Sequence, residues 1–176
     1  PLALLLLVLV VASAIVPKFA TPVTMGYLLF DITPILFIAL AMAPVMITGD
    51  IDLSVGSMVG LSSVTVGLAS QAGLGIPAAI VIALLVGALG GVVNGLLVTR
   101  IKLPPFIVTL GTFNIAFAIT QLYSGAQTVT DLPDAMTWLG NTFALGGAAV
   151  SYGVVLMILL YLAVWFWLRE TGAGRH

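Results

Sequence analysis

Charged residues are scarce in this sequence, and cysteine is absent. Only 6% of the 176 residues are Asp, Glu, Lys or Arg, whereas about 25% is usual for a soluble domain. A surface that faces water cannot be built from so few charges. Because there is no cysteine and the single histidine is His176, disulfides, thiol chemistry and His-ligated metal sites are excluded from this sequence.

The charges that are present also exclude several functions. Five basic and six acidic residues give a net charge of −1, so there is no basic field to hold a nucleic acid. A Walker A loop needs Gly-Lys-Ser or Gly-Lys-Thr to hold phosphates, but Lys18 and Lys102 follow Pro17 and Ile101. No pairing of a nucleophile with a base is visible. We therefore predict no catalytic site, no cofactor and no metal on this chain.

The sequence consists largely of long apolar runs. Hydrophobic residues make up 61% of the sequence, and a helix of about 20 apolar residues crosses a bilayer core of about 30 Å. We predict an all-α integral membrane protein, a polytopic helical bundle forming a single transmembrane domain over 1–176. The chain begins with Pro1 and stops after an apolar run, so we interpret it as part of a longer protein. Six spans are predicted, at 2–16, 28–48, 53–70, 76–99, 104–123 and 150–168.

Basic residues set the predicted orientation. Arg100 and Lys102 share one connection, and Arg169 and Arg175 follow the last span. The long 124–149 connection, in which we expect a short surface helix over 127–138, has two aspartates and no basic residue. The positive-inside rule then predicts that both termini are cytoplasmic, with Lys18 the one basic residue on the opposite side.

Small residues in the 76–99 segment predict close helix packing. Gly87, Gly91 and Gly95 recur at intervals of four, which clears one side of the helix for a neighbouring backbone. Asn94 lies on the same side. An interhelical hydrogen bond is the favoured role for Asn94, and contact with a solute is the alternative.

Two carboxylates, Asp50 and Asp52, interrupt the apolar pattern between the second and third spans. An aspartate at the bilayer centre costs about 2.5–3.5 kcal/mol, so we place both at the cytoplasmic edge or in a wet cavity. Either Asp52 or Ser54 can cap the helix that begins near 53. Capping is the favoured role for Asp52, and a functional role is the alternative.

The predicted 104–123 helix gathers aromatic and amide groups on one side. At about 100° per residue, Phe113, Asn114, Phe117 and Gln121 project together. A sugar presents apolar C–H patches beside hydroxyls, and such a surface can accommodate both. Ordinary packing of these side chains within the bundle is an equally good interpretation on general grounds.

Three ordered segments carry a family resemblance: Ile47–Ser57, Gly90–Val98 and Leu103–Thr112. Together they resemble bacterial ABC sugar-importer permeases of the ribose, xylose and autoinducer-2 type. Asp50 stands where the family pattern Gly-Gly-Ile-Asp-Leu-Ser-Val-Gly has its second glycine. The positions that match or replace motif residues of the family are Gly49, Asp50, Asp52, Ser54, Gly56 and Asn94.

The resemblance implies that this chain is the N-terminal part of a permease subunit in a bacterial inner membrane, and that the permease forms the path of a monosaccharide or related small polar solute. It implies an ATP-binding cassette subunit holding ATP and Mg²⁺, a second permease copy or paralogue, and an extracytoplasmic binding protein. It favours the solute path for the 104–123 side chains, and implies that Gly174–His176 begins a cytoplasmic connection. An ion-coupled secondary transporter and a structural membrane scaffold are the alternatives.

Overall fold

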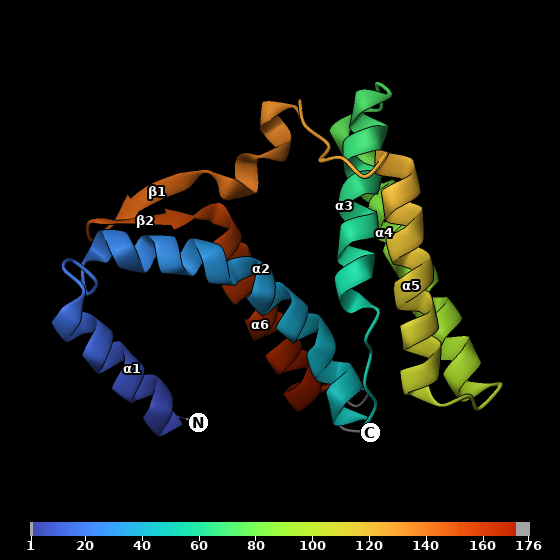
Figure 1. The fold of residues 1–176 in the computed structure, drawn as a ribbon, viewed down its shortest axis with the longest axis horizontal. Coiled ribbons are helices and arrows are strands. Elements are labelled where there is room, and N and C mark those ends of the chain that lie inside the picture. The colour runs from blue at the N-terminus through green and yellow to red at the C-terminus, as the bar shows by residue number, and fades with distance from the viewer. Residues whose placement is uncertain (1, 172–176) are drawn as a thin grey trace. The chain divides into compact units, whose positions relative to one another are not determined.

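The computed structural model describes residues 2–171, which are mostly helical (Figure 1). The predicted cytoplasmic residues Arg175 and His176 lie outside the described residues. The helices are α1 (Leu2–Ile15), α2 (Pro22–Ile47), α3 (Val55–Gln71), α4 (Ile76–Thr99), α5 (Pro105–Ser124) and α6 (Tyr152–Glu170). Between α5 and α6 lie two 3-10 turns, η1 (Asp134–Met136) and η2 (Trp138–Gly140), and the strands β1 (Thr142–Leu145) and β2 (Ala148–Ser151).

Proline, glycine and serine set several of the helix ends. Pro105 begins α5, where the missing N–H costs little because the first turn has no acceptor for it. Gly125 ends α5 in the left-handed conformation, with φ of 62°, which glycine adopts without strain. Ser151 begins α6 by accepting a hydrogen bond from the N–H of Val154 on its side-chain oxygen, at 3.3 Å.

The helices confirm the apolar runs, but their lengths separate them into two groups. Four helices among residues 2–171 are long and apolar enough to cross a membrane, namely α2, α4, α5 and α6. The predicted 2–16 span is a helix of 14 residues, which rises about 21 Å at about 1.5 Å per residue. Helix α3 has 17 residues. Helix α2 begins at Pro22, before the predicted 28, because Thr21 accepts a bond from the Thr24 N–H at 3.4 Å.

A β-hairpin corrects the all-α prediction for the segment before α6. Strands β1 and β2 pair antiparallel, with Thr142 opposite Ser151 and Leu145 opposite Ala148. Their two-residue connection, Gly146-Gly147, has φ of 57° and 86°, the positive values that a tight hairpin turn requires. The predicted surface helix over 127–138 is also wrong. That segment is irregular up to the short turn η1.

The described residues divide into two compact units, the first made of residues 2–37 and 138–171 and the second of residues 38–137. In the first unit, Val150, Val154 and Met157 form a buried cluster. The Tyr161 hydroxyl, which packs against that cluster, donates a hydrogen bond to the Leu36 carbonyl at 3.1 Å. The hairpin, α6 and the first part of α2 are thereby held together by apolar packing and a polar contact.

In the second unit, α3 packs against both α4 and α5 (Figure 1). Small residues make this packing close. A Cβ built on Gly90 would lie 2.5 Å from Cε of Met58, and one on Gly87 would lie 3.6 Å from Oγ of Ser62. Among the described residues nothing lies within 4 Å of a Cβ at Gly91 or Gly95. Of the three glycines spaced four residues apart, Gly87 therefore lies against α3. Close packing of another helix against Gly91 and Gly95 stays a prediction.

Candidate functional site: the polar break and the α3–α4–α5 bundle

The polar break, residues 48–54, joins α2 to α3, and it begins with a helix-terminating turn. Gly49 has φ of 84°. Its N–H donates to the Met46 carbonyl at 3.1 Å, and the Asp50 N–H donates to the Val45 carbonyl at 3.2 Å. This pair of bonds around a left-handed glycine is the Schellman motif. Gly49 is therefore required by the backbone that ends α2.

Asp52 binds the residue that precedes α3. Its Oδ1 accepts hydrogen bonds from the Ser54 N–H at 2.7 Å and from the Ser54 hydroxyl at 2.6 Å. A side chain that accepts from the backbone two residues on forms an Asx turn. Ser54 occupies the N-cap position of α3 but makes no side-chain cap bond of its own. Of the two predicted alternatives, Asp52 rather than Ser54 satisfies a backbone donor here.

Asn94 connects the break to the other two helices. Its Nδ2 donates to the Ser54 Oγ at 3.0 Å, and its Oδ1 accepts from the Thr112 hydroxyl on α5 at 2.5 Å. Asn94 is 6% exposed and Ser54 is 2% exposed. The favoured interpretation of Asn94 as an interhelical hydrogen-bonding residue is thus confirmed. Gly56, by contrast, has open space around it, since no described atom lies within 4 Å of a Cβ built there.

Thr112 is the member of this arrangement to which the sequence assigned no role. It belongs to the matched segment Leu103–Thr112, but a threonine in a membrane helix commonly bonds its own backbone. The Thr112 hydroxyl does lie 3.2 Å from the Val108 carbonyl. Only the position of Asn94 on the adjacent helix shows that the hydroxyl also serves an interhelical bond.

The predicted α5 side chains lie on one flank of the helix. The rings of Phe113 and Phe117 are stacked, with centroids 6.3 Å apart, and Phe117 is 51% exposed. The Asn114 Nδ2 donates to the Leu110 carbonyl at 2.8 Å on its own helix. Gln121 is exposed. The arrangement offers an aromatic face beside two amides, and their role as a solute path stays a prediction.

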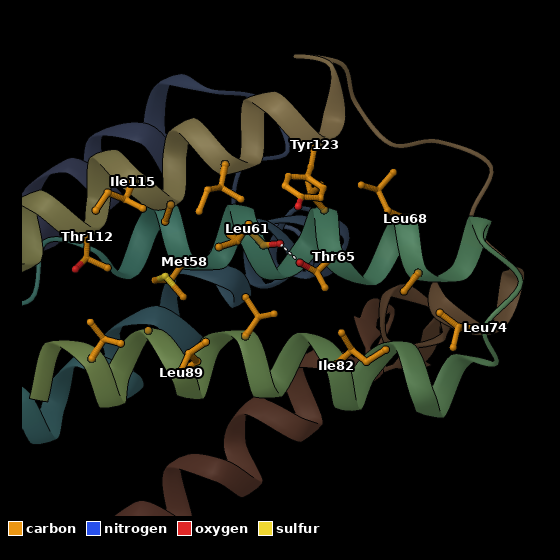
Figure 2. A pocket seen from close by; sticks show the side chains of 17 residues that line it. Met58, Leu61, Thr65, Leu68, Leu74, Ile82, Leu89, Thr112, Ile115 and Tyr123 are labelled. Carbon is orange, nitrogen blue, oxygen red and sulfur yellow. Dashed lines mark hydrogen bonds between the residues drawn. The ribbon is translucent and has the colours of Figure 1, made fainter. Parts of the chain in front are cut away.

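A groove of about 850 Å³ lies among α3, α4 and α5 (Figure 2). Its α5 wall consists of Thr112, Ile115, Ala116, Ile119 and Tyr123, and the four predicted path residues are not part of its lining. The hydroxyl of Thr65 in this groove donates to the Leu61 carbonyl at 2.7 Å. The groove is therefore mainly hydrocarbon and presents few groups that could bind the hydroxyls of a sugar.

Comparison with known proteins identifies a family that covers most of the chain. Residues 24–176 match the family described as the branched-chain amino acid transport system / permease component. No solved structure matches the chain.

Several curated relatives are import permeases. The chain is 38% identical to the fructose import permease protein FrcC of Rhizobium meliloti, over 100% of this chain and 51% of the relative. It is 34% identical to the autoinducer 2 import system permease protein LsrC of an Enterobacter strain, over 94% and 47%. It is 33% identical to the protein LsrD of Escherichia coli, over 99% and 54%. The chain thus spans about half the length of these relatives.

Four apolar helices of membrane-spanning length and the match over most of the chain indicate a multi-pass protein of the bacterial inner membrane. The chain belongs to the family of the branched-chain amino acid transport system / permease component.

Proposed function

We propose that the full-length protein is the permease subunit of an ABC importer, and that it forms the path of a monosaccharide or a related small polar solute. The observation that carries this proposal is the alignment of nearly the whole chain with permeases named for fructose and for autoinducer 2. The sequence motifs behind the resemblance also converge in space. Asp52 and Ser54 from one motif meet Asn94 from the second and Thr112 from the third.

The proposal includes six membrane crossings with cytoplasmic termini. Helix α1, which is short and apolar, and helix α3, which has 17 residues, would complete the set. Arg100 and Lys102 at the α4–α5 connection and Arg169 at the end of α6 support this orientation, because basic residues are enriched on the cytoplasmic side.

Transport of this kind needs partners that supply energy and deliver the solute. We propose an ATP-binding cassette subunit that holds ATP and Mg²⁺, a second copy or paralogue of the permease, and an extracytoplasmic solute-binding protein. This chain would contribute alternating access to the solute path and would not carry out chemical catalysis.

The proposed path runs along the flank of α5 formed by Phe113, Asn114, Phe117 and Gln121. The stacked rings of Phe113 and Phe117 give an apolar surface for the C–H face of a sugar. Asn114 uses Nδ2 toward Leu110, so its Oδ1 can accept a bond from a solute hydroxyl. Aromatic faces combined with a few placed polar groups are typical of small-molecule sites.

Solute uptake tests this proposal in the full-length protein with its ATPase and binding protein present. Asn114→Ala and Phe117→Ala should each reduce uptake while membrane abundance and ATPase association stay normal. Ile115→Ala, on the groove side of α5, is the matched control and should reduce uptake much less. Normal uptake by the Asn114→Ala, Phe117→Ala double variant at normal abundance would falsify the path. Uptake that persists without the ATPase and follows an ion gradient would contradict the importer itself.

A further inference from the structure

A chain of hydrogen bonds crosses the second unit from α5 through α4 to the polar break. Its members are Thr112, Asn94, Ser54 and Asp52, hereafter the Thr112–Asn94–Ser54–Asp52 chain. Asn94 and Ser54 are buried. Water therefore has little access to replace a broken link, and each link must be made by the side chains themselves.

The middle of this chain can be connected in either direction. Hydroxyls and amides each donate and accept, and the orientation of an amide follows from its partners. If the Asn94 amide were turned over, its oxygen would face Ser54 and accept from that hydroxyl. Thr112 could then accept from Nδ2 and donate to the Val108 carbonyl, which lies 3.2 Å away. The hydrogen bond between Asn94 on α4 and Thr112 on α5 therefore does not by itself determine which group donates and which accepts along the chain.

Asp52 selects one direction. An ionised carboxylate only accepts hydrogen bonds, and its Oδ1 lies 2.6 Å from the Ser54 Oγ. At that separation the hydroxyl proton must lie between the two oxygens, because otherwise their lone pairs would face each other. Ser54 then has no proton to give to position 94, and Asn94 must donate to Ser54.

We propose that Asp52 is a positioning residue that fixes the direction of the whole chain, from Thr112 to Asn94 to Ser54 to Asp52. It thereby locks the polar break onto α4 and α5. This inference concerns the structure of the break and does not depend on the identity of the solute. Its consequence is that the side chain at position 94 must donate a hydrogen bond to Ser54. An ionised carboxylate has nearly the same shape as the amide but cannot donate one.

The variant Asn94→Asp tests this requirement. At a pH at which both carboxyl groups are ionised, it places two carboxylates on either side of Ser54, which has one hydroxyl proton to share between them. We expect amide hydrogen exchange in the segment 49–58 of the full-length protein to become roughly tenfold faster, as for the loss of about one buried hydrogen bond. Asp52→Asn alone should change this exchange little, because the Asn oxygen still accepts from Ser54.

The double variant Asp52→Asn, Asn94→Asp should restore slow exchange and membrane abundance. In it, the amide at position 52 keeps its oxygen on the Ser54 N–H, the donor that Asp52 binds, and turns its nitrogen toward the Ser54 Oγ, which then donates to the carboxylate at position 94. The chain then runs in the opposite direction between these residues. A role in packing alone predicts no such rescue, because the residue volumes hardly change in any of these variants.

Asn114→Asp is the matched control, since Asn114 bonds its own helix and lies outside the chain. Asp52→Asn should not rescue a defect at position 114. Three results would each overturn the proposal: wild-type exchange in Asn94→Asp at a pH at which both carboxyl groups are ionised, no rescue by Asp52→Asn, or equal rescue of the variants at positions 94 and 114. Should Asn94→Asp fail to accumulate, recovered abundance of the double variant supports the proposal and unrecovered abundance overturns it.

Discussion

Gly26 on α2 lies against the backbone of β2, so that replacing it with alanine should displace the hairpin. A Cβ at this position would lie 2.5 Å from the Ala149 carbonyl oxygen and 3.0 Å from the Ala149 nitrogen. Neither atom can rotate away, because both belong to the main chain of a strand paired with β1. The hairpin and α2 must therefore separate by roughly 1 Å to reach ordinary van der Waals contact.

The size of the effect follows from two opposing terms. Overpacking of a close contact costs about 1–3 kcal/mol, while alanine in a helix interior gains about 0.5–1 kcal/mol over glycine. Gly26→Ala should therefore lower the free energy of unfolding by up to about 2.5 kcal/mol. Gly111→Ala on α5 is the matched control, because nothing described lies within 4 Å of its Cβ position. It should show only the stabilising term.

Thermal unfolding of the full-length protein in detergent measures both variants under the same conditions. A change of 1 kcal/mol moves the midpoint by about 2–4 °C in domains of this size, so the two variants should move it in opposite directions. If Gly26→Ala were as stable as Gly111→Ala, the hairpin would not pack on α2 at this contact.

Two further predictions address topology and the polar break. In this cysteine-free chain, Thr99→Cys should be shielded from an impermeant external thiol reagent and Thr130→Cys should be labelled; the reverse pattern would contradict the proposed orientation. Gly49→Ala should lower the free energy of unfolding by about 1–2 kcal/mol, because an L-residue is strained at the positive φ of Gly49. An unchanged midpoint in a thermal scan would argue against the Schellman turn.

Much of the helical framework could be predicted from the sequence, because long apolar runs bounded by proline leave little choice. The predicted 76–99 span coincides with α4, and the predicted 104–123 span differs from α5 by a residue at each end. The hairpin was missed for a physical reason. Its second strand is apolar and runs directly into α6, so the predicted 150–168 span merged strand and helix. Gly146-Gly147 between two short apolar runs was the available signal.

The candidate site was predictable only in part, because its bonds join distant segments. Asn94 could be assigned an interhelical bond from its place beside small residues, but neither Ser54 nor Thr112 could be identified as its partners. Helical periodicity orders residues around one helix and carries no information on which side of a neighbouring helix it meets. The proposed path on α5 rests on that periodicity and on exposure, whereas the hydrogen-bonded site rests on tertiary contacts.

The structure also explains how this chain can carry Asp50 where the family pattern has a second glycine. The Schellman turn needs a left-handed residue at one position, which Gly49 fills with φ of 84°. Asp50 supplies the N–H that bonds the Val45 carbonyl, and any residue except proline has that N–H. Asp50 is not among the described non-glycine residues that have a positive φ. Aspartate at position 50 therefore adds a half-exposed carboxylate without straining the backbone. We expect its effect to be electrostatic and to act on charged groups that come near the polar break.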